Sequence, residues 1–468
     1  ASTFSVTGCA TSSTRSGVHK ERTMSEPPLL EISDVTVEFA TRRGIVRAVE
    51  QINISLAKGE TLGIVGESGS GKSVTSYAVM RILDRAGSIA NGSVVFSGID
   101  VKNAKEDVMR DLRGREMSMI FQNPRAALNP IRKVGRQIED VLKQHVMADS
   151  RDLREKAIEM LRQVKIARPE ERYHAYPFEL SGGMCQRIVI ALALACQPRL
   201  LIADEPTTGL DVTTQKSVMD LVVELTRARD MSTILITHDL GLAAAYCDRV
   251  VVMEKGRIVE TALSSEIFRS PQHAYTKKLM KATPRVGSSL RSLLPDDAEL
   301  SPAASMPKRS IDKGAKPILE VRNLVKEYPR QGATKTLGEL FGKPAPAESL
   351  FRAVDGISFH VAKGESVGLV GESGCGKSTT SMMVMRLLDK TSGDIVFDGE
   401  DIGSIPAAKF AVLPQRKRIQ MVFQDPTDSL NPRFTAARAI ADPIMQLGGI
   451  SGRDALRVRC EELAKLVG

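Results

Sequence analysis

The order of apolar and polar positions predicts strands that alternate with helices over the first half of the chain. Apolar and polar residues alternate over 29–39 and 46–56, which indicates half-buried strands. Short uninterrupted apolar runs, typical of strands buried on both faces, cover 61–65, 200–203 and 233–237. Helical spacing covers 71–83, 132–145, 151–164 and 187–195. The pattern predicts an α/β fold with a mostly parallel sheet, and its antiparallel strands are expected early, before residue 66.

A long internal repeat divides the chain into two copies of one domain. The stretch TLGIVGESGSGKS, which ends at Ser73, recurs as SVGLVGESGCGKS, which ends at Ser378. The stretch MIFQNPRAALNP, which ends at Pro130, recurs as MVFQDPTDSLNP, which ends at Pro432. So long a period indicates a duplicated domain rather than a solenoid. The second copy stops where the first is barely past its middle, so this sequence is either a fragment or the product of a truncated gene.

Composition narrows the class of protein. The chain has 468 residues, 42% hydrophobic and 26% charged, which is ordinary for globular protein of more than one domain. No run of 18 uncharged apolar residues occurs, so any membrane role is expected to come through a partner. The net charge of +9 is scattered and does not by itself indicate nucleic acid. Six cysteines without metal-ligand spacing predict free thiols in a reducing compartment.

Two Gly-rich loops, 66–73 and 371–378, carry the strongest chemical signal. Both fit the phosphate-loop pattern, and each is expected to follow an apolar strand and to open a helix. In such a loop, backbone N–H groups converge on phosphate oxygens, a lysine (Lys72 or Lys377) reaches the β- and γ-phosphates, and the final serine binds Mg²⁺. The predicted nucleotide ligands are Gly66, Ser68, Gly69, Ser70, Gly71, Lys72 and Ser73 in the first copy, and Gly371, Ser373, Gly374, Cys375, Gly376, Lys377 and Ser378 in the second.

Two further motifs follow in the first copy. The apolar run LLIADE ends in Asp204, a candidate ligand for Mg²⁺, and Glu205, a candidate for polarising an attacking water. The alternative for this pair is an acidic strand end that caps a helix. The segment LSGGMCQ places Ser181, Gly182 and Gly183 just before a helix, where they form a second anion cradle.

The order phosphate loop, Gln122, LSGGMCQR, LLIADEP, GLD and LITHD resembles the ABC ATPase family. The resemblance implies that ATP and Mg²⁺ are bound and that the LSGG segment of one cassette serves the ATP held by the opposite cassette. It further implies that Gln122 contacts Mg²⁺ or water and is catalytic together with Lys72, Glu205 and His238. Asp211 matches the residue that bridges the two cassettes.

Three weaker assignments also follow from the resemblance. Gln424 matches Gln122 in the second copy and is a candidate Mg²⁺ ligand with Ser73, Ser378 and Asp204. Phe39 and Tyr328 stand where the family carries an aromatic residue that stacks on adenine, although an aromatic at a strand end is more often part of the core. A satisfied core histidine is the alternative for His238 taken alone.

The segments FQNPRAALNP, YPFELSGGMCQR and HAYTKKLMKATP resemble the importer branch for dipeptides, oligopeptides and nickel. The resemblance implies an ATPase that powers import of peptides or related small solutes. Its implied partners are two transmembrane permease subunits, a solute-binding protein and a second cassette within or between chains, with no nucleic acid. The implied location is peripheral, at the cytoplasmic face of a bacterial inner membrane. Cys185 departs from the arginine usual in this branch.

Other classes share these ATPase motifs and fit less well. A repair protein is expected to carry CxxC pairs or a long coiled coil, and a translation factor a charged helical linker; neither feature is present. A regulatory binding module built on the incomplete second copy stays open.

Five segments are expected. They are 1–28, a disordered N-terminal extension whose first 23 residues are either non-native or a targeting segment; 29–262, the first nucleotide-binding domain; 263–290, an importer-type C-terminal extension; 291–317, a flexible linker rich in Pro and Ser; and 318–468, a partial second nucleotide-binding domain.

Overall fold

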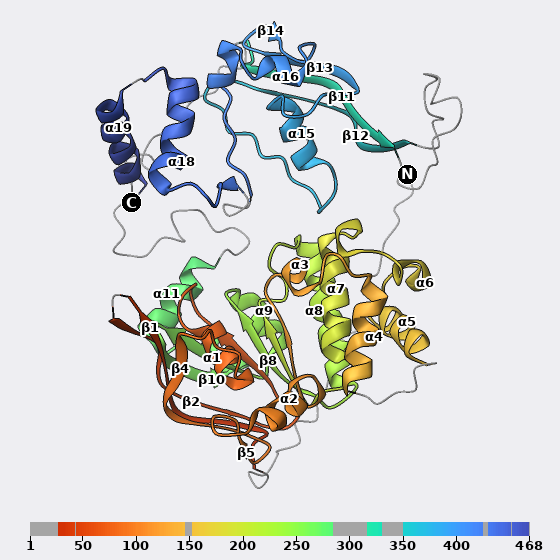
Figure 1. The fold of residues 1–468 in the computed structure, drawn as a ribbon, viewed down its shortest axis with the longest axis vertical. Coiled ribbons are helices and arrows are strands. Elements are labelled where there is room, and N and C mark those ends of the chain that lie inside the picture. The colour runs from red at the N-terminus through yellow and green to blue at the C-terminus, as the bar shows by residue number, and fades with distance from the viewer. Residues whose placement is uncertain are drawn as a thin grey trace, which may run out of the picture. The chain divides into compact units, whose positions relative to one another are not determined.

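The structure of the chain is a computed structural model that describes residues 27–42, 44–145, 152–283, 316–329, 350–424, 429–450 and 452–467. The expected N-terminal extension and linker lie outside the described residues, except for the positions at their edges. The chain divides into two compact units, residues 1–298 and 299–468, and each is described by itself. Figure 1 shows the elements of both.

An antiparallel sheet forms one layer of the first unit. Its strands are β1 (Leu30–Thr41), β2 (Gly44–Leu56), β4 (Gly87–Phe96) and β5 (Ile99–Asp100), in the order β2-β1-β4-β5. The expectation that the antiparallel strands all precede residue 66 is therefore wrong for β4 and β5. Strand β1 pairs with β2 along one edge and with β4 along the other, so a later segment completes the sheet.

The core sheet of the first unit is mostly parallel, as predicted. Its strands are β3 (Thr61–Val65), β6 (Met117–Ile120), β7 (Leu200–Asp204), β8 (Ser232–Thr237), β9 (Arg249–Glu254) and β10 (Arg257–Leu263), in the order β10-β9-β3-β8-β7-β6. Every pairing is parallel except that of β10 with β9. The uninterrupted apolar runs form the inner strands because both of their faces are covered.

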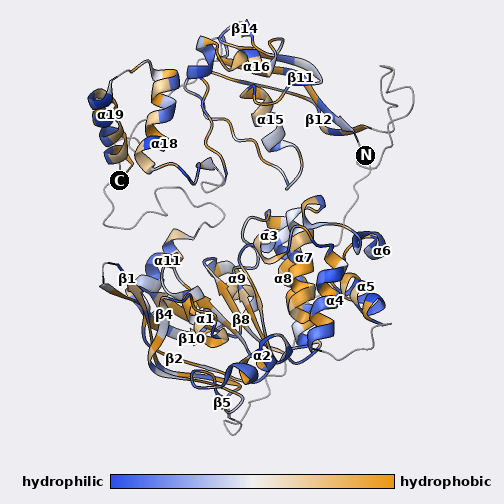
Figure 2. Cartoon of the chain, in the orientation of Figure 1, coloured by the Kyte–Doolittle hydropathy of each residue, from blue (hydrophilic) through white to orange (hydrophobic). Residues whose placement is uncertain are grey.

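Helices cover this sheet and build a separate helical part. They are α1 (Lys72–Met80), α2 (Glu106–Arg115), α3 (Pro124–Ala127), α4 (Val134–His145), α5 (Leu153–Gln163), α6 (Pro169–Arg172), α7 (Gly182–Leu194), α8 (Val212–Arg227), α9 (Leu240–Tyr246), α10 (Ser264–Ile267) and α11 (Ala274–Ala282), with a 3-10 turn at Pro177–Glu179. The predicted helices correspond to α1, α4, α5 and α7. Figure 2 shows hydrophobic residues along α7 and α8, which enclose the larger of the two cores of this unit.

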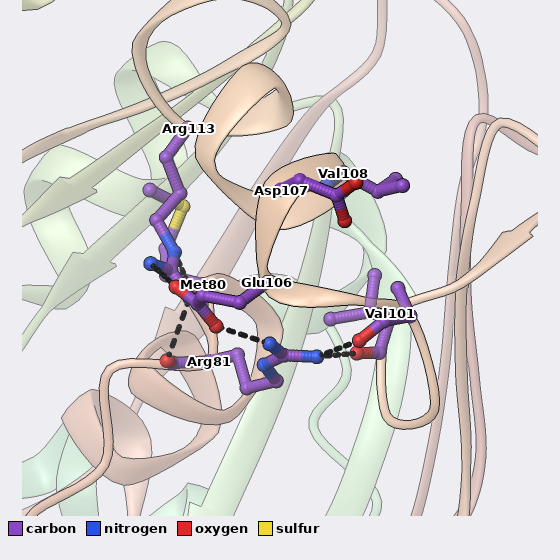
Figure 3. A network of polar contacts seen from close by, with 8 residues as sticks. Met80, Arg81, Val101, Glu106, Asp107, Val108 and Arg113 are labelled. Atoms are coloured by element: carbon purple, nitrogen blue, oxygen red, sulfur yellow. Dashed lines mark hydrogen bonds and ion pairs between the residues drawn. The ribbon is translucent and has the colours of Figure 1, made fainter.

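A polar network holds the carboxyl end of α1, the helix that follows the first Gly-rich loop (Figure 3). Arg113 donates to the carbonyl oxygens of Met80 (3.0 Å) and Arg81 (3.2 Å), so a cation satisfies carbonyls that the helix leaves unpaired. Glu106 pairs with the side chains of both arginines. Arg81 also donates to the carbonyl oxygen of Val101, at 3.3 Å. The network joins α1 to α2 and the antiparallel sheet.

The second unit repeats only part of this architecture. Its described strands are β11 (Leu319–Pro329), β12 (Leu350–Val361), β13 (Ser392–Phe397) and β14 (Glu400–Asp401), in one antiparallel sheet of order β12-β11-β13-β14. Its helices are α15 (Lys377–Val384), α16 (Ala407–Phe410), α18 (Ala436–Pro443) and α19 (Arg453–Leu466), with a 3-10 turn at Pro414–Lys417 and a π turn at Ile444–Gly448. The mostly parallel core sheet expected for this copy is not found among its described residues.

The apolar run 366–370, before the second Gly-rich loop, shows why no parallel sheet is found there. Residues 366–370 form no strand, and Val370 is 93% exposed, whereas its counterpart Val65 is fully buried. In the first unit, β3 lies between β8 and β9. Among the described residues of the second unit, no strand lies beside this run, so it has no neighbour with which to pair. The expectation that the second loop follows a strand is therefore wrong.

Candidate functional site

Four neighbouring strands of the first unit end at one edge of the core sheet. In the order β3-β8-β7-β6 they lead into the loop 66–73, His238, the Asp204–Glu205 pair and Gln122. Because all four strands run parallel, residues that follow their carboxyl ends gather at the same edge. The topology thereby brings together the predicted catalytic and phosphate-binding residues.

The loop 66–73 requires glycine at the positions where the backbone of other segments approaches it. A Cβ on Gly66 would lie 2.2 Å from the carbonyl oxygen of Met253. Gly71 has a φ of 98°, and a Cβ there would lie 2.8 Å from the carbonyl oxygen of Ala48. No side chain fits either place without a shift of the backbone. The exposed Ser68 and Gly69 complete the turn.

Lys72 lies folded over this loop as the first residue of α1. Its side chain is buried, and its Nζ donates to the carbonyl oxygens of Gly66 (2.8 Å) and Glu67 (2.7 Å). Burial lowers the pKa of the ammonium, and the charges of Glu205, Asp204 and Glu67 oppose that effect. The cation is therefore held beside the acidic pair and above the phosphate loop.

Asp204 has the features of a cation ligand. It is 1% exposed, its Oδ1 accepts a hydrogen bond from Ser73 Oγ at 3.0 Å, and its Oδ2 has no partner among the described residues although it is buried. Burial raises the pKa of this carboxyl, while the hydrogen bond from Ser73 lowers it. A buried, unpaired carboxylate oxygen beside a hydroxyl fits a hard cation such as Mg²⁺. The alternative prediction, that this acidic pair caps a helix, does not hold for Asp204.

Glu205 collects donors from three segments. Its Oε2 accepts from Gln122 Nε2 (3.0 Å) and Thr208 Oγ1 (3.0 Å), and it lies 3.3 Å from His238 Nδ1. The backbone of Glu205 is left-handed, with a φ of 45°, which is uncommon for a residue with a side chain. Such strain is found at functional sites, where the surrounding structure maintains it. Thr208 was not among the residues predicted from the sequence.

The LSGG segment lies apart from this cluster. Ser181 is the N-cap of α7, and its Oγ accepts from Met184 N at 3.3 Å. Gly182 and Gly183 form the first turn of that helix. In the part of the chain that the structure describes, no hydrogen bond or ion pair joins the segment to Lys72, Asp204 or Glu205. Cys185 is buried with its Sγ 3.4 Å from the carbonyl oxygen of Pro177, so its thiol bonds to the preceding turn.

Two other predicted residues have clear structural roles. Asp211 caps α8, because its carboxylate accepts from Thr214 N (3.0 Å) and Thr214 Oγ1 (2.8 Å). Phe39 packs its ring on Gly87 and against the core between the two sheets. Their proposed contacts with a second cassette and with adenine stay predictions.

The second unit holds a similar loop in a more open setting. Lys377 Nζ donates to the carbonyl oxygens of Gly371 and Glu372, both at 2.6 Å. Ser378 is exposed, and so is Gln424. Residues Ser373, Gly374, Cys375 and Gly376 form the turn before α15. Tyr328 stands at the end of β11, with Lys326 Nζ 5.2 Å from its ring centre.

Cys375 is expected to react with iodoacetamide at least about ten times faster than Cys196, because only a thiolate is nucleophilic. Cys375 is exposed, with its Sγ 3.6 Å from Lys377 Nζ, whereas burial raises the pKa of Cys196 to about 11. ATP is expected to slow the labelling of Cys375. Mass-spectrometric peptide mapping measures both rates, with Cys375→Ser as the control. Equal rates, or no effect of ATP, contradict this prediction.

Comparison with known proteins places these features in a family. A family model described as "ABC transporter" matches residues 49–208 and 354–468. The chain is 40% identical over 435 residues to the glutathione import ATP-binding protein GsiA of Pectobacterium atrosepticum, and the match covers 90% of this chain and 68% of that protein. The protein of the same name from Escherichia coli is 39% identical over 441 residues, with 91% and 69% covered. A dimeric ATP-binding cassette solved with ADP and Pi is 26% identical, with a TM-score of 0.46, and the match covers 50% of this chain and 98% of that one.

Proposed function

Since this chain belongs to the ABC transporter family of ATP-binding proteins, we propose that it hydrolyses ATP to power import of peptides or related small solutes. The observation that carries the proposal is the meeting of Gln122, Thr208 and His238 on one carboxylate oxygen of Glu205. This cluster lies at the same edge of the core sheet as the phosphate loop, so a carboxylate that can act as a base lies next to the loop that binds phosphate.

Each side chain then has a role in hydrolysis. Glu205 accepts the proton of the attacking water, and Gln122, Thr208 and His238 hold its carboxylate in place. Lys72 and the N–H groups of the loop stabilise charge on the phosphates. Ser73 and Asp204 would hold Mg²⁺, which would neutralise charge on the phosphates, and Gln122 is a further candidate ligand.

We further propose that the chain carries two cassettes in tandem and that the second, residues 318–468, is partial. It would bind nucleotide through Lys377 and Ser378, and Gln424 and Tyr328 are its candidate Mg²⁺ and adenine contacts. Its residues include no counterpart of the Asp204–Glu205 pair, the LSGG segment or His238. The first cassettes of two chains would then pair so that Ser181 of each serves the ATP held by the other.

The proposed partners are two permease subunits and, in the whole importer, a solute-binding protein. In the described part of the chain, no helix has both the length and the apolar character to cross a bilayer. Between Gln122 and Ser181, two large apolar side chains are strongly exposed: Ile131 (86%) and Phe178 (70%). They are candidates for the surface that binds a permease. The proposed location is peripheral, at the inner face of a bacterial plasma membrane.

Co-expression with the permease subunits is expected to bring the chain to the membrane fraction. The double variant Ile131→Ser, Phe178→Ser should return most of it to the supernatant, because it removes two apolar anchors. Val412→Ser is the matched control, since Val412 is also 86% exposed but lies in the second unit. Fractionation followed by immunoblotting measures the distribution. A chain that stays entirely in the supernatant with the permeases present contradicts the proposed location.

A further inference from the structure

The helix α11, in the predicted C-terminal extension, contacts the first phosphate loop directly. The backbone N–H of Glu67 donates a hydrogen bond to the hydroxyl of Tyr275, at 3.1 Å. These residues are 208 positions apart, so the contact is made by the fold and not by the local chain. Tyr275 is 7% exposed, and its ring belongs to the core cluster that also contains Val65, the last residue before the loop.

The position of Tyr275 is itself fixed by β10. The carboxylate of Glu260, on that strand, accepts from the backbone N–H groups of Gln272 (2.8 Å) and His273 (3.0 Å). His273 then caps α11, because its Nδ1 accepts from the backbone N–H of Tyr275 at 3.2 Å. A carboxylate and an imidazole thus hold the first turn of the helix, and the tyrosine enters the core from a defined point.

Glu67, which donates to Tyr275, also accepts hydrogen bonds from other residues of the loop. The carbonyl oxygen of Glu67 accepts from Lys72 Nζ (2.7 Å) and from the backbone N–H of Ser70 (3.2 Å). The backbone of Glu67 is therefore fixed at its carbonyl by the loop and at its N–H by Tyr275. Gly256 supports the far side of the same loop, because its N–H donates to the carbonyl oxygen of Ser70 at 3.1 Å.

We propose that Tyr275 is a positioning residue for the phosphate loop, by which the C-terminal extension sets the affinity of the first cassette for the phosphates of ATP. This inference rests on the proposed ATP site at Lys72. The Tyr275 hydroxyl accepts from the Glu67 peptide and makes no hydrogen bond to Glu205 among the described residues, so it acts by holding that peptide. Loss of that hydrogen bond frees a loop whose N–H groups bind phosphate only when they converge.

The test is the affinity of the full chain for the fluorescent nucleotide trinitrophenyl-ATP, in a Lys377→Ala background that removes the cation of the second loop. Tyr275→Phe keeps the ring in the core and deletes only the hydroxyl. We expect it to raise the Kd about threefold to tenfold, the range for loss of one hydrogen bond. Hydrogen exchange of the peptide spanning residues 61–72 is expected to become faster as well.

Tyr246→Phe is the matched control, because it deletes a tyrosine hydroxyl that donates to Asp220 Oδ1 at 2.8 Å, away from the loop. It should change neither the Kd nor the exchange of the loop. A Tyr275→Phe protein with the Kd of this control overturns the inference, even if its thermal stability falls. Failure of the Lys377→Ala protein itself to bind, or binding that survives Lys72→Ala, instead overturns the proposed ATP site.

Discussion

Glu205→Gln is expected to lower the rate of ATP hydrolysis at least about a hundredfold, the usual scale for loss of a general base. Glutamine keeps the shape of the side chain but cannot take a proton from water. ATP binding should persist, because Lys72, Ser73 and Asp204 are unchanged. Phosphate release by the assembled transporter measures the rate, and equilibrium nucleotide binding measures the affinity.

Glu224→Gln is the control for that experiment. Glu224 also belongs to the first unit, where it pairs with Lys165 at 2.6 Å on the exposed surface, and such pairs contribute little. Its replacement should leave the hydrolysis rate within about twofold of the unaltered protein. A Glu205→Gln protein that hydrolyses ATP at the normal rate would show that another group is the base.

Ser181→Arg is expected to reduce hydrolysis by about a hundredfold or more, the scale for loss of a preorganised anion site. The change places a bulky cation at the amino end of α7, where the resemblance to the family puts the phosphate of the opposite ATP. Nucleotide binding by the chain should be little affected, since no hydrogen bond joins Ser181 to Lys72, Asp204 or Glu205 among the described residues. The hydrolysis rate of the unaltered chain should also rise with protein concentration, because the first cassettes of two chains would pair.

Loss of the helix cap is the competing explanation for such an effect, and it costs about 1 kcal/mol. Thr435→Arg controls for it, because Thr435 caps α18 with a bond of the same length, 3.3 Å to the N–H of Arg438. This control should unfold slightly earlier in a thermal scan and hydrolyse ATP normally. Equal losses of activity in the two variants would contradict a role for the LSGG segment in the ATP site.

Three of the six strands of the first core sheet were predictable because their side chains are buried on both faces. The runs 61–65, 200–203 and 233–237 have no competing pattern, and they became β3, β7 and β8. Strand β4 was missed: Gly87 and Gly92 fall within it, and β-propensity is low at glycine. The error in the second unit has another origin. The run 366–370 has the composition of a strand, but a strand of a parallel sheet requires neighbours, which local sequence does not reveal.

Some residues of the candidate site were also predictable from the sequence, and others were not. Lys72, Asp204 and Glu205 were predictable because they stand at fixed positions after apolar strands. Thr208 was not, because a threonine in a turn forms no pattern and its hydrogen bond to Glu205 is visible only in the structure. The contact of Tyr275 with Glu67 joins distant parts of the chain, and only the folded structure brings them together.

The most direct test of a shared ATP site is to mix two inactive variants. Glu205→Gln and Ser181→Arg chains are each expected to be inactive alone. In a mixed pair, one site combines the intact Glu205 of one chain with the intact Ser181 of the other. Random pairing should then restore about a quarter of the unaltered hydrolysis rate, because half of the pairs are mixed and each holds one intact site. A mixture no more active than the sum of its two components would contradict the account.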